Sequence, residues 1–169
     1  MKRIRIAVAA LLALAVCGCA SYSWRPTVPA HMRTVSVSTF RNESSATGLG
    51  SAITTQTLRE FQREGTFKIA PAGESAIEVQ GIVRDSGSHA VAYARKTGER
   101  NREHRLRATA IVSFIDKKSG KVLVDNRKYT ATTSFLAGDD ILTGERDATG
   151  RLAEEFARQI VDDALTLKW

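Results

Sequence analysis

The chain has 169 residues, with 25 lysines and arginines against 18 aspartates and glutamates, for a net charge of +7. Lys2, Arg3 and Arg5 precede a hydrophobic run and are expected to be removed with it, and the remaining excess of +4 is too small to indicate a nucleic-acid partner. Both cysteines, Cys17 and Cys19, adjoin that run, so the rest of the chain can form neither a disulfide nor a thiolate metal site.

The N-terminus is typical of a secretory signal. A basic head is followed by an apolar run over residues 6–16, which is shorter than the about 20 residues that a membrane span requires. The small residues around Cys19 resemble the lipobox of bacterial lipoproteins. Cys19 fits the lipidated position better than Cys17, because Gly18 is small at the cleavage position whereas Val16 is bulky. The alternative is a plain secretory signal with an incidental cysteine.

These features predict a signal peptide over residues 1–18, a lipidated N-terminus and short tether over 19–32, and one domain over 33–169. Ala20, rather than aspartate, follows the expected lipidated cysteine, which resembles outer-membrane sorting. Tyr22 and Trp24 in the tether would either pack on the edge of the domain or lie at the lipid interface.

The first half of the domain begins with alternating apolar and polar residues over 33–40, which predict a half-buried strand, and a polar turn over 41–45. A helical period then runs from about Gly48 to Glu64, and Gly65 is a suitable terminator. Short strands are expected over 66–70 and 76–84. Gly81 falls on the apolar face of the second of these, which suggests a bulge or a close approach of another backbone.

The second half begins with a long basic connection over 85–105. The clearest strand of the chain follows over 106–114, then a hairpin turn over 116–120 and a returning strand with a bulge near Asp125 and Arg127. A second helix follows Asp140. The predicted fold is an α+β two-layer sandwich, with two helices on one face of a mainly antiparallel sheet of four to five strands. Phe61 and Phe156 lie on the two apolar helical stripes and are expected in the core.

The sequence contains no constellation typical of an enzyme. His31, His89 and His104 lack metal-ligand spacing, and the segment Gly48-Leu49-Gly50 is too short for a phosphate loop. The acidic pairs at 139–140 and 162–163 are better explained by a helix start and a solvated helix face. We therefore expect no catalytic residue, no metal site and no cofactor.

Several segments together resemble the LptE family of lipopolysaccharide-assembly lipoproteins. They are the stretch from Cys19 through Tyr22-Ser23-Trp24-Arg25 into the strand ending Phe40-Arg41-Asn42, and then the residues over 65–69, 77–83 and 118–123 with the closing helix. The resemblance implies a lipid-anchored protein on the periplasmic face of the outer membrane. Its implied partners are the β-barrel translocon LptD, which it would plug and help to assemble, and lipopolysaccharide, which it would bind during export. An N-acyl chain such as palmitate on Cys19 is part of the same implication.

One basic cluster stands out within residues 95–107. It comprises Arg95, Lys96, Arg100, Arg102, Arg105 and Arg107. Such a run is either a solvated hairpin tip or an anion site, since the planar guanidinium suits the phosphates of lipid A. Arg105 and Arg107 are expected on one face of a strand, about 7 Å apart, with Leu106 and Ala108 pointing the other way.

The sequence is compatible with two functions. One is a translocon plug that also binds lipopolysaccharide. The other is a regulatory or secretion-pore lipoprotein that acts on a cell-wall synthase or another envelope complex. The short tether after Cys19 favours a domain that stays close to its membrane.

Overall fold

The computed structural model describes residues 28–96, 99–137, 141–167 and 169. The predicted signal peptide, Cys19, Tyr22 and Trp24 lie outside these ranges. In chain order the elements are η1 (Ala30–Met32), β1 (Thr34–Val37), β2 (Arg41–Asn42), α2 (Leu49–Glu64), β3 (Lys68–Ile69), β4 (Ile77–Lys96), β5 (Glu99–Asp116), β6 (Val122–Ala137) and α3 (Ile141–Thr166).

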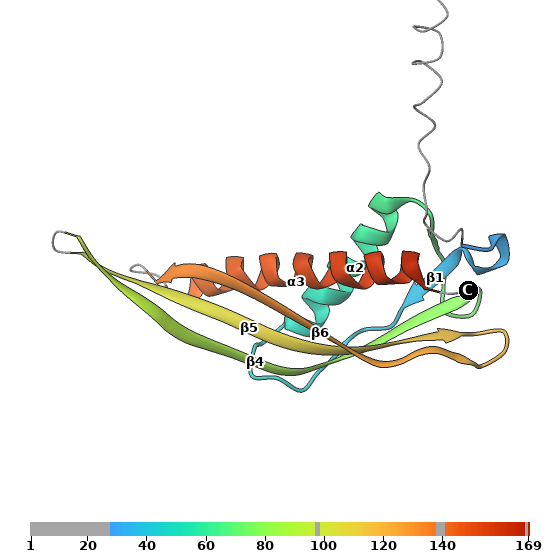
Figure 1. Cartoon of the computed structure of the whole chain (residues 1–169), viewed down its shortest axis with the longest axis horizontal. Helices are drawn as coiled ribbons and strands as arrows, with labels where there is room; N and C mark the ends of the chain where they lie inside the picture. The colour runs from blue at the N-terminus through green and yellow to red at the C-terminus, as the bar shows by residue number, and fades with distance from the viewer. Residues whose placement is uncertain (1–27, 97–98, 138–140, 168) are drawn as a thin grey trace, which may run out of the picture.

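The two helices cover one face of a single long sheet, as predicted (Figure 1). The strand order is β3-β1-β4-β5-β6, and β2 also pairs with β4. Strands β4, β5 and β6 form an antiparallel meander, whereas β1 and β2 run parallel to β4 and β1 runs parallel to β3. The prediction of four to five mainly antiparallel strands is therefore wrong: the sheet is mixed and has six strands.

The parallel pairs follow from the position of α2 in the chain. Parallel neighbours need a crossover of a dozen or more residues, and α2 supplies it between β1 and both β3 and β4. The helix ends where the sequence predicts. Gly65 adopts a left-handed conformation with φ of 83°, and its N–H donates to the carbonyl of Phe61 at 3.2 Å.

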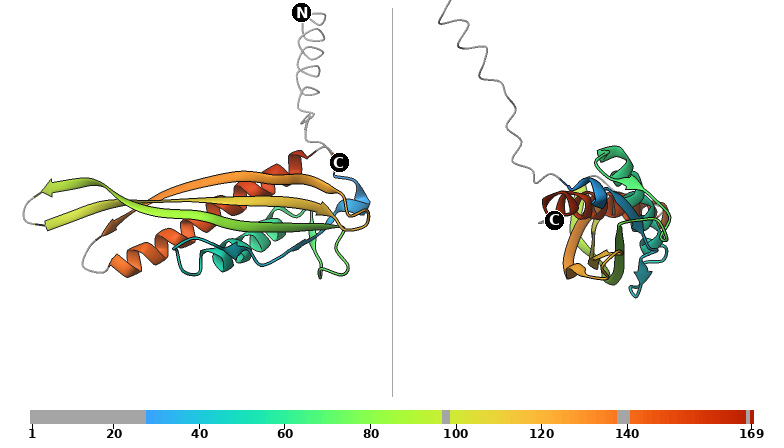
Figure 2. Two further views of the ribbon diagram at one scale, coloured as in Figure 1. Left: turned by 90° about the horizontal axis from the view of Figure 1, so that it is seen from below. Right: turned by 90° about the vertical axis from the view of Figure 1, so that its right-hand side faces the viewer.

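The core lies between the helices and the inner face of the meander. Phe61 and Phe156 are fully buried, as predicted from their helical stripes. They pack among alternate residues of the strands, including Val79, Val112 and Phe114. Figure 2 shows that the opposite face of the sheet has no helix over it.

The long strands differ most from the sequence prediction. The expected strand over 76–84 continues to Lys96, and the expected basic connection over 85–105 is mostly paired strand in β4 and β5. The polar residues over 85–89 have weak strand propensity, and the backbone ladder to β5 overrides it. Likewise Arg41 and Asn42, predicted in a turn, pair with β4.

Gly81 is explained by a side chain rather than by a backbone or a bulge. A Cβ atom at this position would overlap the Phe40 ring, which lies directly over the glycine. The register shifts of β4 fall instead between Val83 and Asp85 and between Ala90 and Ala92. The bulge predicted in β6 is confirmed near Asp125, next to Asn126, whose φ is 48°.

Glu78 links three segments on the helix-free face near the start of β4. It accepts hydrogen bonds from Ser38 at 2.6 Å and from the ammonium of Lys117 at 2.8 Å. The contact with Lys117, followed by that with Ser38, lowers the pKa of Glu78 to about 2 from its ordinary 4.5. The network ties the β1–β2 connection and the β5–β6 turn to β4.

We predict that Glu78→Gln lowers the free energy of unfolding at neutral pH by about 2–3 kcal/mol, allowing for solvent around Lys117. A depressed folded-state pKa stabilises the fold above pH 4.5, and this contribution is lost as the pH falls from about 4.5 to 2. Urea unfolding across that range should show a flatter pH dependence in the variant. The control is Glu74→Gln at an exposed position. Equal losses in both variants, or an unchanged pH slope, would contradict the assignment.

Candidate functional site

The predicted basic cluster lies along the hairpin formed by β4 and β5. Arg95 and Lys96 end β4, and Arg100, Arg102, Arg105 and Arg107 follow in β5. The register places Arg95 opposite Arg100 and Tyr93 opposite Arg102. The side chains of Arg95, Lys96, Arg100 and Arg102 lie outside the described part of the structure, so the site is built here from Arg105 and Arg107.

Arg105 and Arg107 are exposed on the helix-free face of β5, as their spacing predicts. Leu106 and Ala108 are only 2% and 1% exposed and face the helices. Successive side chains of a strand point to opposite faces, so the same alternation that buries the leucine presents both arginines to solvent.

The neighbouring strands surround these two arginines with further polar groups. In β4, His89 lies opposite Arg105 and Gly87 opposite Arg107. A Cβ atom on Gly87 would be 3.4 Å from Nε2 of His89, so the imidazole lies beside the glycine. On the other side, the register pairs both arginines with hydroxyl residues of β6. We call this surface the basic face; its residues are His89, Arg105, Arg107, Thr132 and Ser134.

The charges of the basic face are not neutralised within the fold. Neither Arg105 nor Arg107 forms an ion pair with any described residue. Asp85 and Glu103 lie next to the basic face along the strands, but neither forms an ion pair with Arg105 or Arg107. Arg84, one strand away, is by contrast bound to Glu43 at 2.6 Å. Two free guanidinium groups with nearby hydroxyls can bind an anion such as a phosphate.

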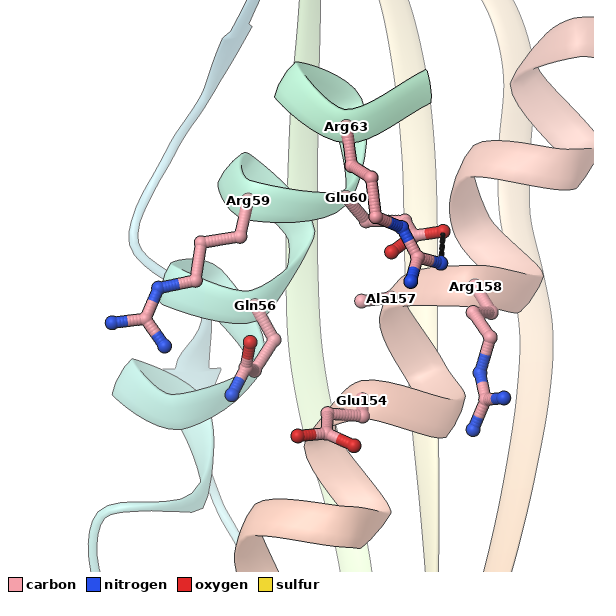
Figure 3. A pocket seen from close by; sticks show the side chains of 7 residues that line it. All are labelled: Gln56, Arg59, Glu60, Arg63, Glu154, Ala157 and Arg158. Atoms are coloured by element: carbon pink, nitrogen blue, oxygen red, sulfur yellow. Dashed lines mark hydrogen bonds and ion pairs between the residues drawn. The ribbon is translucent and has the colours of Figure 1, made fainter.

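A hollow of about 290 Å³ lies between α2 and α3 (Figure 3). Arg63 contacts Glu60 at 2.6 Å within the hollow, while Arg158 pairs with Glu155 beside it at 3.2 Å. Ala157 also lines it. This hollow is polar, and two of its three arginines, Arg63 and Arg158, are held in ion pairs, whereas Arg105 and Arg107 of the basic face form none with any described residue.

The expected absence of catalytic chemistry stays a prediction. Within the described ranges, no group of three or more histidine, cysteine, aspartate or glutamate residues is placed to hold a metal ion. His104 stacks on Phe135 with ring centroids 5.5 Å apart, and His31 lies far off in η1. No helix among the described residues has the length and apolar character needed to cross a bilayer.

Sequence reasoning from the chain alone missed His89 and the hydroxyls of Thr132 and Ser134 as parts of this surface. They join Arg105 and Arg107 only through the register of three strands, and the register depends on bulges that shift it by single residues. Parity in the middle of β6 is a usable signal, because all the even-numbered residues from Lys128 to Ser134 are polar.

The fold is shared with bacterial proteins of low sequence identity. A candidate lipoprotein from Caulobacter crescentus CB15 matches with a TM-score of 0.56 and 16% identity, over 78% of this chain and 88% of that one. Protein XCC0632 from Xanthomonas campestris matches with a TM-score of 0.55 and 14% identity, over 84% and 87% of the two chains. A comparison with curated protein sequences finds no match.

These likenesses define the class of protein as a two-layer α+β domain of a kind also found in a candidate bacterial lipoprotein. The family model of LptE, described as lipopolysaccharide-assembly, matches residues 32–164. The chain therefore belongs to the LptE family, which confirms the family resemblance seen in the sequence.

Proposed function

We propose that the protein is an outer-membrane lipoprotein that plugs and helps to assemble the LptD β-barrel translocon and binds lipopolysaccharide during its export. The match to the LptE family across almost the whole described domain is the observation that carries this proposal. Family membership supports lipopolysaccharide assembly as the process in which the chain acts, and a non-enzymatic role is consistent with it. No cofactor and no nucleic acid are part of the proposal.

The basic face supports a direct role in binding lipopolysaccharide. Arg105 and Arg107 are exposed on one face and form no ion pair with any described residue, so binding of a phosphate would not break an ion pair within these ranges. Hydrogen bonds between guanidinium and phosphate are charge-assisted and about twice as strong as neutral ones. The other candidates, Arg95, Lys96, Arg100 and Arg102, continue along the same hairpin towards its tip.

About a dozen residues separate Cys19 from the first strand, β1, which begins at Thr34. A tether of this length keeps the domain close to whichever membrane holds the lipid, and the diacylglyceryl and N-acyl chains together would anchor it stably. The proposed location is the periplasmic face of the outer membrane.

Affinity purification of the tagged protein from detergent-solubilised outer membranes tests the barrel partnership. We predict recovery of a large β-barrel protein in near-equal amount, measured by quantitative mass spectrometry. A cell-wall synthase or a secretion complex recovered in its place would refute the proposal and favour the regulatory alternative.

We predict that Arg105→Glu with Arg107→Glu weakens binding of purified lipopolysaccharide at least about tenfold, because two charge-assisted contacts are replaced by repulsion. The free energy of unfolding should change by only about 0–1 kcal/mol, since both side chains are exposed. Binding by the parent should also weaken as salt rises, because exposed charges are screened over about 8–10 Å.

The matched control for this charge reversal is Lys118→Glu with Lys121→Glu in the exposed β5–β6 turn, which changes the net charge equally. Equal loss of binding in both double variants would show that the change in net charge alone explains the effect. Unchanged lipopolysaccharide binding with a lower yield of barrel complex would instead assign the basic face to the barrel. No change in either assay would leave a solvated hairpin.

Lipidation is predicted at Cys19. Cys19→Ala should release a soluble periplasmic form or leave an unprocessed precursor, whereas Cys17→Ala should leave the acylated product intact. Mass spectrometry of the mature N-terminus decides between them, and an acyl group on Cys17 would overturn the assignment.

A further inference from the structure

β6 is a long edge strand, because β5 is its partner on one side and no described strand pairs with it on the other. Its pairing with β5 is unbroken from Arg127 to Ala137. A regular edge of this length presents a row of backbone N–H and C=O groups that another strand can join. Proteins commonly interrupt such edges with proline or a bulge, and this part of β6 has neither.

Two side chains of α3 reach over this edge. The amide of Gln159 donates to the carbonyl oxygen of Thr130 at 3.3 Å, and the guanidinium of Arg151 donates to the carbonyl oxygen of Ser134 at 3.0 Å. Arg151 also contacts the hydroxyl of Thr133 at 3.4 Å. Figure 1 shows α3 beside β6, and these hydrogen bonds place both side chains against the strand.

The space between the edge and the helix is a groove of about 500 Å³. Its strand wall consists of residues 130–133, and its helix wall carries the two residues that occupy the edge together with Glu154, Glu155 and Arg158. The opposite charges on the helix wall balance, so the groove selects neither an acidic nor a basic segment. What it offers is the backbone of β6.

The two occupied carbonyls identify which backbone groups face outwards. Backbone groups of alternate residues in a strand point to the same side, so those of Lys128, Thr130, Thr132, Ser134 and Leu136 all face the free edge. The occupied carbonyls are placed symmetrically about Thr132. An antiparallel pair of two β6 strands centred on Thr132 would therefore join Thr130 of each copy to Ser134 of the other.

The side chains also suit this self-pairing. Thr132 would meet Thr132, and the threonine–serine pairs beside it are favourable cross-strand neighbours. Lys128 would lie opposite Leu136, whose side chain is 63% exposed, so the pairing brings no two cations together. Like charges directly opposite each other would have opposed it.

We propose that the β6 edge is a self-association surface for a second copy of this chain, and that Arg151 and Gln159 hold it closed. The carbonyls of Thr130 and Ser134 that they occupy are the acceptors that the second strand needs. Removal of these two donors frees both acceptors and opens the edge. The β6 edge shares Thr132 and Ser134 with the basic face, but the inference rests on the backbone groups of β6 and does not depend on the proposed lipopolysaccharide and barrel function.

The test is the molar mass of Arg151→Ala with Gln159→Ala, measured on the full chain in detergent by light scattering with the detergent contribution subtracted. The expected result is an approximately twofold rise in protein mass at concentrations where the parent is a single chain. The matched control is Arg158→Ala, which removes one side chain from the same groove but no hydrogen bond to β6. A double variant that stays a single chain, a parent that is already a dimer, or a control that dimerises equally would each overturn the proposal.

A cross-linking measurement identifies the surface used. Thr132→Cys in the double-variant background should give a cross-linked dimer with a short thiol reagent. Thr109→Cys, on the same face of the interior strand β5, should not. The same background without an added cysteine accounts for Cys17 and Cys19. Self-pairing would be overturned by dimers that cross-link equally through both positions or by dimers that do not cross-link at Thr132→Cys. A cross-link to a different polypeptide would also overturn it and would assign the edge to a strand of that partner.

Discussion

Burial of the sheet on one face only is the constraint on which the rest of this structure depends. α2 and α3 cover the inner face, and every strand residue must therefore suit either a packed apolar layer or solvent. In β5 this alternation buries Leu106 at 2% exposure and places the arginines on either side of it in water. The basic face thus follows directly from the burial pattern. Folding leaves the charged side chains of Arg105 and Arg107 in water, so it carries no desolvation cost for them.

α3 is held on the sheet by polar contacts at both ends of its contact with β6. Asp163 accepts hydrogen bonds from the guanidinium of Arg127 and the hydroxyl of Tyr129. Burial and the bond to this carboxylate raise the pKa of Tyr129 far above its ordinary value, so the hydroxyl stays a donor. Arg151 forms the corresponding contact near the other end. Apolar packing alone allows a helix to slide, whereas these directional bonds fix its register on the strand.

The sequence was a good guide wherever local periodicity decides the structure. The helical stripes located Phe61 and Phe156, and Gly65 marked the end of α2, because these signals need only neighbouring residues. It failed over residues 85–105, where weak strand formers are held by pairing with a partner strand, and at Gly81, where the ring of Phe40 comes from the β1–β2 connection. The arginines of the basic face were predictable from parity, but His89 joins them only through a register that bulges determine.

The mixed sheet also bears on the order of folding. The β5–β6 turn joins strands only a few residues apart, and the β4–β5 hairpin is equally local. Val35, by contrast, pairs with Ile77, so β1 cannot enter the sheet until a segment more than forty residues downstream is available. Contacts between residues far apart in the sequence form slowly, because the chain loses the entropy of loop closure before the contacts stabilise it. The N-terminal strand that follows the tether can therefore join the meander only after β4 has emerged during synthesis, and β3, whose partner in the sheet is β1, enters the sheet through it.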